Sequence, residues 1–332
     1  MKVAFAGSFA ARLAEPVRAQ LSLPCEFVAD DDETAIVAHL HDADVLVSMS
    51  FSASMAEVAP RLRLVQVPGA GLDRIDRDAL RPGVHLANAC GHEAGIAEYI
   101  IGAMIALTRS FARLDAALRQ GQWESQWAIG AAAPPLWPEL AGRTLGILGF
   151  GHIGQALARR AAAFDMRVCA VRRHAQPDGP DRVAFIAGPE RIDDVLQQSD
   201  YVAITLPLSA ETRNLINDRR LRLMRPSAFL INVGRAEVCD EGALYRALAS
   251  GGIAGAALDV WYRYPTQAGP TPPASQPFHE LRNVIMTPHV SGWTDGMLAA
   301  RASLIAENIA RIARGETPLN AVSTPPLAAS SF

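Results

Sequence analysis

The sequence predicts an α/β protein with two doubly wound parallel-sheet domains, and three observations support this prediction. Short apolar runs alternate with helical segments along most of the 332 residues, as in proteins built from βαβ units. The runs are almost continuously apolar, which is typical of strands buried on both faces of a parallel sheet. One run, at 144–148, is followed by the glycine-rich turn GFGHIG at 149–154 and by a helical segment at 155–165. Strand, glycine turn and helix in this order indicate a Rossmann dinucleotide-binding unit.

The composition limits the classes of protein to which the chain can belong. Half of the residues are hydrophobic and the net charge is −3, so two buried cores are feasible and no nucleic-acid surface is expected. The four cysteines are scattered without a CxxC pair, which indicates buried free thiols in a reducing compartment, and no metal site is predicted. No run reaches the ~18 apolar residues of a membrane span, and the N-terminal run is too short for a signal peptide. We therefore expect a cytoplasmic protein.

Strands and helices are assigned from apolar periodicity. Strands are expected at 3–6, 45–48, 64–67, 84–87, 168–171, 201–206, 229–233, 256–260 and 284–287. Helices are expected at 54–60 and 294–314. A longer helix is predicted from 95 to 120, because apolar residues recur there every three or four positions, and Gly121 is expected to end it.

Two segments are expected to be irregular. The loop at 122–139 carries Trp123, Trp127 and Trp137, and these aromatic side chains form either a subunit contact or a lid over the core. The tail at 319–332 is rich in proline, serine and alanine, so poor order is expected there.

The glycines at 149–154 have separate roles in the predicted nucleotide site. Gly149 allows the tight turn, Gly151 lets the pyrophosphate approach the backbone, and Gly154 lets helix and strand pack closely. The N-terminus of the helix then offers free N–H groups and a partial positive charge to the phosphates.

The end of the second strand favours NADP over NAD. An NAD site places an acidic residue there, on the ribose hydroxyls, but this strand ends at Val171 and is followed by Arg172, Arg173 and His174. Arginine attracts a 2′-phosphate, which a carboxylate would repel. The alternative is a solvated basic turn, in which case NAD is accepted as well.

Several motifs occur in a fixed order along the chain. They are GAGLDRID at 69–76, Ala97-Glu98, GRTLG at 142–146, NVGR at 232–235, ALDV at 257–260 and TPHVSG at 287–292. With these motifs the chain resembles the D-isomer-specific 2-hydroxyacid dehydrogenases over nearly its whole length. The resemblance implies a Rossmann cofactor domain, 101–290, inserted into a flavodoxin-like substrate domain made of 1–100 and 291–332. The active site would lie between the two, and a homodimer through the long helix is implied.

Two residues are expected to be catalytic. Arg235 suits the grip on a substrate carboxylate, since a guanidinium binds planar oxyanions through paired hydrogen bonds and stays charged. His289 suits proton transfer, because its ordinary pKa of ~6.5 is near neutrality. The alternatives are a surface arginine and a histidine that is hydrogen-bonded at a strand end, but the NVGR and TPHVSG contexts favour catalysis.

One position departs from the resemblance. The family usually carries a glutamate five residues after the aspartate of ALDV, and this glutamate pairs with the histidine; here the position is Tyr264. Either Tyr264 orients the imidazole of His289 or it only packs beside Pro265. Formate dehydrogenases also lack that glutamate and share Asp-Val-Trp, but their substrate-loop asparagine is replaced here by His92.

Further site residues follow from the resemblance. Backbone N–H groups of Ala70 and Gly71 would meet the substrate carboxylate, and His92 would either face the substrate or cap the following helix. The cofactor would contact His152, Ile153, Leu206, Pro207, Thr212, Val233, Gly234, Asp259 and Gly292, in addition to the glycines and arginines named above. Asp259 would meet the nicotinamide carboxamide, with a helix cap or an ion pair as its alternative.

These observations predict an oxidoreductase. It would reduce a small 2-oxo acid, such as glyoxylate or hydroxypyruvate, to the (R)-2-hydroxy acid with NADPH or NADH. The alternatives are a formate-type dehydrogenase and a non-enzymatic nucleotide sensor on the same scaffold, since a fold does not fix a function.

Overall fold

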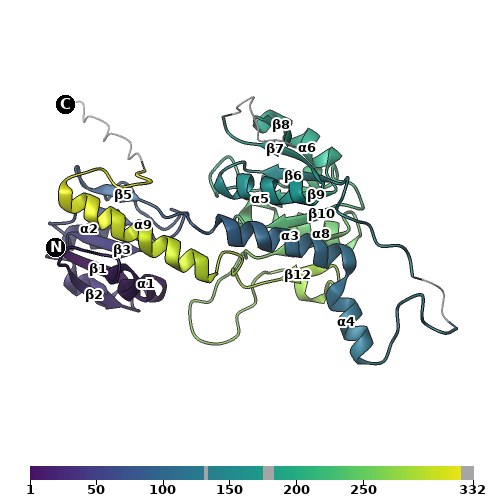
Figure 1. Ribbon diagram of the computed structural model, residues 1–332, viewed down its shortest axis with the longest axis horizontal. Coiled ribbons are helices and arrows are strands. Elements are labelled where there is room, and N and C mark those ends of the chain that lie inside the picture. Colours follow the sequence, from purple (N-terminus) through teal and green to yellow (C-terminus); the bar gives the residue numbers. More distant parts are fainter. Residues whose placement is uncertain (131–133, 175–182, 323–332) are drawn as a thin grey trace. The chain divides into compact units, whose positions relative to one another are not determined.

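The structure, a computed structural model, describes residues 1–130, 134–174 and 183–322, and these divide into two compact units (Figure 1). Unit 1 contains Met1–His92 and the segment that begins at Thr294, whereas unit 2 contains Glu93–Trp293. The functional domain boundaries at 100/101 and 290/291 stay a prediction. Of the tail at 319–332, positions 323–332 lie outside the described residues.

Unit 1 is built on a parallel sheet with the strand order β2-β1-β3-β4-β5 in the described residues. This is the flavodoxin-like order of a doubly wound sheet, as predicted. Its strands are β1 (Lys2–Ala6), β2 (Glu26–Asp30), β3 (Val45–Ser48), β4 (Leu64–Gln66) and β5 (His85–Ala87). Its helices are α1 (Ser8–Arg18), η1 (Ala35–His39), α2 (Ala53–Val58) and α9 (Asp295–Arg314).

The C-terminal helix belongs to the core of unit 1. α9 packs against α1, and its Ile305 and Ile309 are buried with Val3 and Phe5 of β1 (Figure 1). Its apolar side chains recur at helical spacing and therefore form one buried stripe. Thr294 caps the helix by accepting a hydrogen bond from the Met297 amide.

A buried polar network fixes the chain beyond α9. The Asn308 side chain donates to Oε1 of Gln66 (2.7 Å) and to the Leu319 carbonyl (3.1 Å), and it accepts from the Leu319 amide (2.6 Å). Asn308 and Gln66 are both fully buried, so each needs these partners. The network holds residue 319 beside the helix, and Ala321 then forms an antiparallel bridge with Ala87.

Unit 2 carries a second, larger parallel sheet. In the described part of the chain its order is β12-β11-β10-β9-β6-β7-β8, which is the doubly wound Rossmann order with an added edge strand. The strands are β6 (Thr144–Leu148), β7 (Arg167–Val171), β8 (Val183–Ala187), β9 (Tyr201–Ile204), β10 (Phe229–Asn232), β11 (Gly255–Leu258) and β12 (Val284–Met286). The order reverses between β6 and β9, and ligands bind at such switch points.

Helices cover the sheet of unit 2 (Figure 1). They are α3 (Glu93–Arg109), α4 (Phe111–Arg119), α5 (His152–Ala163), α6 (Ile192–Gln198), α7 (Asp218–Leu221) and α8 (Glu241–Ala249), with short turns η2 (Pro189–Arg191), η3 (Ala236–Val238) and η4 (Phe278–Glu280). α3 packs against α5 and against β10, β11 and β12. α3 therefore covers part of one face of this sheet.

The single helix predicted over 95–120 was wrong, because the chain bends at Ser110. This residue has φ 52, in the left-handed region, and it separates α3 from α4 by a bend of 55°. The apolar periodicity continues through the bend, so the pattern gave no sign of it. Gly121, with φ 75, follows the end of α4 as expected.

The described residues contain no single helix with the length and apolar character to cross a bilayer; α3 and α4 meet both criteria only when they are counted together.

The loop after α4 leaves its aromatic residues open to solvent. Trp127 is 75% exposed and Trp123 is also exposed, so neither covers the core of unit 2. All four cysteines are free, with Cys169 and Cys239 buried and Cys25 and Cys90 half-buried. Burial is therefore confirmed for two of the four thiols.

Candidate active site

The glycine turn after β6 is shaped by close backbone contacts. Gly149 has φ 108, and a Cβ there would lie 3.0 Å from the Thr205 carbonyl carbon. A Cβ on Gly154 would lie 2.7 Å from the Gly149 carbonyl oxygen. Both positions therefore require glycine for the fold of the turn itself.

Gly151 is different, since a Cβ there would meet nothing within 4 Å. The protein leaves space at this residue, directly before the first turn of the twelve-residue helix α5. A backbone that can be approached closely beside a helix N-terminus fits a pyrophosphate group. These residues thus fit the dinucleotide that the sequence implies.

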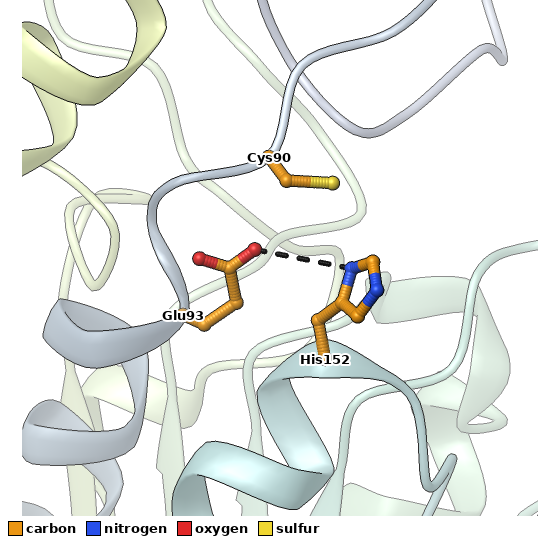
Figure 2. Close-up of side chains that lie close together, drawn as sticks. All are labelled: Cys90, Glu93 and His152. Atoms are coloured by element: carbon orange, nitrogen blue, oxygen red, sulfur yellow. Dashed lines mark ion pairs between the residues drawn. The ribbon is translucent and has the colours of Figure 1, made fainter. Parts of the chain in front are cut away.

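His152 and Ile153 begin α5 on the same turn. His152 is exposed, and its Nδ1 lies 4.0 Å from a carboxylate oxygen of Glu93, the first residue of α3 (Figure 2). Ile153 is half-buried and packs against the core of unit 2. The contact between His152 and Glu93 joins the N-terminal turns of α5 and α3, and these two helices pack on each other.

Two arginines follow β7. The Arg172 amide donates to the Ala187 carbonyl (2.9 Å), so its backbone continues the sheet, while Arg173 is exposed. The pKa of Glu211 is lowered, first by the hydrogen bond from the Ser209 hydroxyl and then, after its own backbone, by the charge of Arg173. Arg173 thus lies near the loop that follows β9.

The loop after β9 packs on the turn after β10. A Cβ on Gly234 would lie 2.5 Å from the Leu206 carbonyl oxygen, so this approach requires glycine. The Thr212 hydroxyl donates to the Pro207 carbonyl (2.7 Å) and closes its own loop. Leu206 is thereby held beside Gly234 and Thr212 beside Pro207. These four residues and Val233 were expected to contact the cofactor.

A buried asparagine builds the turn that carries Arg235. Asn232, at the end of β10, accepts from the Gly234 amide (3.0 Å) and donates to the Arg235 carbonyl (3.0 Å). Nη1 of Arg235 donates to the Gly234 carbonyl (2.9 Å). Backbone and guanidinium are therefore fixed at the carboxyl end of the strand, where ligands bind in open α/β sheets.

Asp259 holds the segment that carries His289. The side chain is fully buried and accepts from the Thr287 hydroxyl (2.6 Å), the Val290 amide (2.9 Å) and the Ser291 amide (2.8 Å). Three donors on one carboxylate give a strong local clamp. We call Thr287–Ser291 with Asp259 the aspartate clamp; Gly292 follows it directly.

His289 lies at the centre of the aspartate clamp in an uncommon backbone conformation. Its φ is 59, a region that few residues other than glycine adopt and that is enriched at functional sites. Nδ1 of its ring lies 2.8 Å from the Tyr264 hydroxyl. Of the two roles considered for Tyr264, the geometry favours contact with the imidazole.

The surroundings of His289 favour its neutral form. The ring is exposed at the surface of unit 2, yet the protein on its other sides still removes water, and this desolvation lowers the pKa below the ordinary 6.5. The charge of Arg235 lowers the pKa further, while Asp259 opposes both. Arg235 follows β10 and His289 follows β12, and both strands pair with β11, so the two residues lie at the same edge of the sheet.

Unit 1 carries the remaining predicted residues. The Asn88 side chain donates to the Ala70 carbonyl (3.0 Å) and so fixes the loop that contains Gly71, while Ala70 itself is exposed. His92 is only 7% exposed, and its Nδ1 accepts from Nη2 of Arg301 (3.0 Å). His92 is thus anchored to α9.

Residues that sequence reasoning missed support the aspartate clamp. The Tyr99 hydroxyl on α3 lies 2.6 Å from the Thr287 hydroxyl, which itself donates to Asp259. Nε1 of Trp261 donates to the Thr287 carbonyl (2.8 Å). Trp261 and Thr287 stand in the motifs already noted, whereas Tyr99 is 188 residues from Thr287 and no local pattern indicates their contact.

Comparison with known proteins agrees with this geometry. Residues 101–291 match the family model described as the NAD binding domain of D-isomer specific 2-hydroxyacid dehydrogenases. The chain is 36% identical over 291 residues to a glyoxylate reductase of Pyrococcus furiosus, covering 85% of this chain and 83% of that protein.

Solved structures agree as well. A D-isomer specific 2-hydroxyacid dehydrogenase family protein from Aeromonas salmonicida superposes with a TM-score of 0.80 at 26% identity, over 97% of this chain and 99% of that one. An acyclic imino acid reductase in complex with NADPH and D-Arg has the same fold, with a TM-score of 0.79 at 24% identity over 97% and 100% of the two chains. The chain therefore belongs to the D-isomer-specific 2-hydroxyacid dehydrogenase family and is an NAD(P)-dependent oxidoreductase that acts on CH–OH groups.

Proposed function

We propose that the protein reduces a small 2-oxo acid to the (R)-2-hydroxy acid with hydride from NADPH, and that Arg235 and His289 act on the substrate. The single observation that carries this proposal is their placement in unit 2: Arg235 follows β10 and His289 follows β12, and both parallel strands pair with β11, so the two residues lie at the same edge of the sheet. In this arrangement the guanidinium can bind the carboxylate of a 2-oxo acid while the imidazole acts on the oxygen of its C2 carbonyl.

The protein's own groups would divide the work. A bound NADPH would supply the hydride for C2 of the substrate. The Arg235 guanidinium binds the carboxylate through paired hydrogen bonds and polarises the C2 carbonyl. His289 donates to the C2 oxygen and supplies its proton.

NADPH is the proposed donor because of the end of β7. Arg172 and Arg173 stand where an NAD-specific site carries an acid. Both arginines can pair with a 2′-phosphate, and no acidic residue lies between Val171 and His174. NAD remains the competing cofactor.

The relatives support a small substrate. The matched archaeal proteins are named glyoxylate reductases, and glyoxylate or hydroxypyruvate would need only the carboxylate grip and the proton donor. The non-enzymatic sensor loses support, since these relatives are enzymes. Formate oxidation stays a second candidate for one reason: Tyr264 replaces the glutamate, and that reaction needs no proton transfer.

A substrate screen with matched variants tests the proposal. Oxidation of NADPH is followed with glyoxylate, hydroxypyruvate, pyruvate and bulkier 2-oxo acids, and reduction of NAD⁺ or NADP⁺ is followed with formate. Arg235→Ala should lose about a hundredfold or more in kcat/KM on the best 2-oxo acid. Arg246→Ala is the control, because Arg246 is an exposed residue of α8. Equal activity of Arg235→Ala and Arg246→Ala would refute the role of Arg235, and turnover of formate alone would establish the second candidate.

A homodimer is proposed as well, formed through α3, α4 and the loop that follows. Phe111 and Leu118 of α4 and Trp123 and Trp127 of the loop expose large apolar side chains, and exposed apolar patches mark interaction sites. Sedimentation of the pure protein should give about twice the chain mass of 35.5 kDa.

The cytoplasmic location stays a prediction.

A further inference from the structure

The tyrosine at the glutamate position has a defined partner in this protein. Tyr264 follows β11, His289 follows β12, and the Tyr264 hydroxyl oxygen lies 2.8 Å from Nδ1 of His289. The two ring centroids are 5.7 Å apart and the planes are tilted by 52°. The contact is therefore a directed hydrogen bond through the hydroxyl rather than a stacking of rings.

The Tyr264 hydroxyl has a second partner, which occupies one acceptor position of its oxygen. Its oxygen lies 3.3 Å from the backbone nitrogen of Trp261. A backbone N–H only donates, so the phenol oxygen accepts this bond, and its own O–H proton stays available for a second bond. Of the two groups that the described residues place within hydrogen-bond distance of the Tyr264 hydroxyl, Nδ1 of His289 is the one that can accept its proton.

We infer that Tyr264 is a positioning residue that holds neutral His289 as the Nε2–H tautomer. A neutral imidazole carries one proton, and if Nδ1 accepts a hydrogen bond the proton is on Nε2. Nε2 then presents a donor to the C2 oxygen of a 2-oxo acid. This inference rests on the proposed reduction for its catalytic meaning, but the tautomer itself can be observed without turnover.

A hydroxyl and a carboxylate at position 264 orient the ring with different electrostatic consequences. A glutamate would favour the imidazolium by its negative charge, whereas Tyr264 is neutral, since desolvation raises the pKa of its hydroxyl. The charged groups that act on His289 itself are Arg235, which opposes protonation, and Asp259, which favours it; Glu237 acts on the Tyr264 hydroxyl.

The sign of the pH dependence follows. Because desolvation and Arg235 lower the pKa of His289 below 6.5, the imidazolium is populated only at acid pH. Above this pKa the neutral ring, as the Nε2–H tautomer, only hydrogen-bonds the C2 oxygen, because loss of its single proton would leave an imidazolate. The transferred proton comes from the imidazolium, which gives up Nε2–H and becomes a neutral ring. Reduction, which consumes a proton, should therefore become faster as the pH falls through this lowered pKa.

Nitrogen NMR of the histidine rings tests the tautomer directly. Full-length protein labelled with ¹⁵N-histidine is examined between pH 5 and pH 9, and the His289 signals are identified by their loss in His289→Gln. The expected pattern at pH 8 is a protonated Nε2 and an unprotonated Nδ1. Tyr264→Phe should give a mixture of the two tautomers. Tyr264→Glu should raise the His289 midpoint by about one pH unit or more.

Kinetics give the second readout. In Tyr264→Phe, kcat on the best 2-oxo acid should fall about tenfold with KM within about twofold, because the Arg235 grip is untouched. Tyr264→Glu should restore kcat and move the pH profile of reduction upward. Tyr262→Phe is the control: it also removes a tyrosine hydroxyl from this loop, one that donates to the Cys239 carbonyl (3.0 Å), and it should leave tautomer and pH profile unchanged.

Two outcomes would overturn the inference: an Nδ1–H tautomer in the parent protein, or an unchanged Nε2–H tautomer in Tyr264→Phe. The proposed function fails separately, by the absence of turnover on every 2-oxo acid in the parent protein. In that case the NMR result still decides whether Tyr264 sets the tautomer.

Discussion

The Thr287 hydroxyl donates to Oδ1 of Asp259 over 2.6 Å, and this bond joins the end of β11 to the segment that carries the histidine. Two backbone amides of the same segment donate to the same carboxylate. Because Asp259 is fully buried, the carboxylate and its donors depend on one another.

Removal of the carboxylate should therefore loosen the aspartate clamp. Asp259→Ala leaves two amides unpaired, and we expect a loss of about 2–4 kcal/mol in unfolding free energy and a large loss of kcat/KM. Chemical unfolding and steady-state kinetics measure the two effects. Asp115→Ala, which removes an exposed carboxylate on α4, should change stability by less than about 0.5 kcal/mol. Equal effects of the two substitutions would show that the clamp contributes nothing.

Two glycines of the same turn should respond differently to alanine. At Gly154 a Cβ would lie 2.7 Å from a carbonyl oxygen, whereas at Gly151 it would meet open space. Gly154→Ala should lower both thermal stability and cofactor affinity. Gly151→Ala should keep the melting temperature within about 2 °C and weaken NADPH binding about tenfold or more by blocking the approach of the pyrophosphate. Calorimetry and equilibrium dialysis separate these effects; unchanged binding in Gly151→Ala would place the cofactor elsewhere.

The cofactor preference should follow the charge at the end of β7. Arg172→Asp should shift the ratio of kcat/KM for NADPH over NADH by about tenfold or more towards NADH, because a carboxylate repels the 2′-phosphate. Arg159→Asp reverses a charge on an exposed part of α5 and is the matched control. A ratio that moves no further in Arg172→Asp than in the control would exclude Arg172 from cofactor selection.

The network around Asn308 should matter for stability rather than for catalysis. Asn308→Ala leaves Oε1 of Gln66 and both backbone groups of Leu319 without this partner. We expect a loss of about 2–3 kcal/mol, seen as an earlier midpoint in urea. Ser303→Ala on the same helix removes an exposed hydrogen bond to Gln20 and should have little effect. A midpoint as high as that of Ser303→Ala would contradict this assignment.

The fold could be predicted from sequence because its buried strands are apolar and its glycine turn is distinctive. Both sheets and the family were confirmed by the strand orders and the comparisons. β2 was missed, since this edge strand of unit 1 contains Glu26 and Asp30 and is only partly buried, and β8 was missed at an edge of the sheet of unit 2. The bend at Ser110 has no marker in the apolar pattern.

At Arg235 and His289 chemistry and motif coincide, so the sequence singles them out, and their catalytic roles stay a prediction. What surrounds them depends on contacts between distant segments. Nothing near Tyr99 indicates that its hydroxyl meets Thr287, and nothing near Tyr264 decides between packing and a bond to His289. Such pairs form only when the fold brings segments that are distant in the sequence into contact.

The left-handed backbone at His289 implies a conflict between durability and activity. A non-glycine residue in that conformation is strained by roughly 1–3 kcal/mol relative to glycine. This protein has a histidine there, with φ 59. A chain selected for thermal endurance alone would carry His289→Gly. Directed evolution for heat resistance without an activity screen should accumulate that replacement and yield proteins that are more stable to heat but inactive.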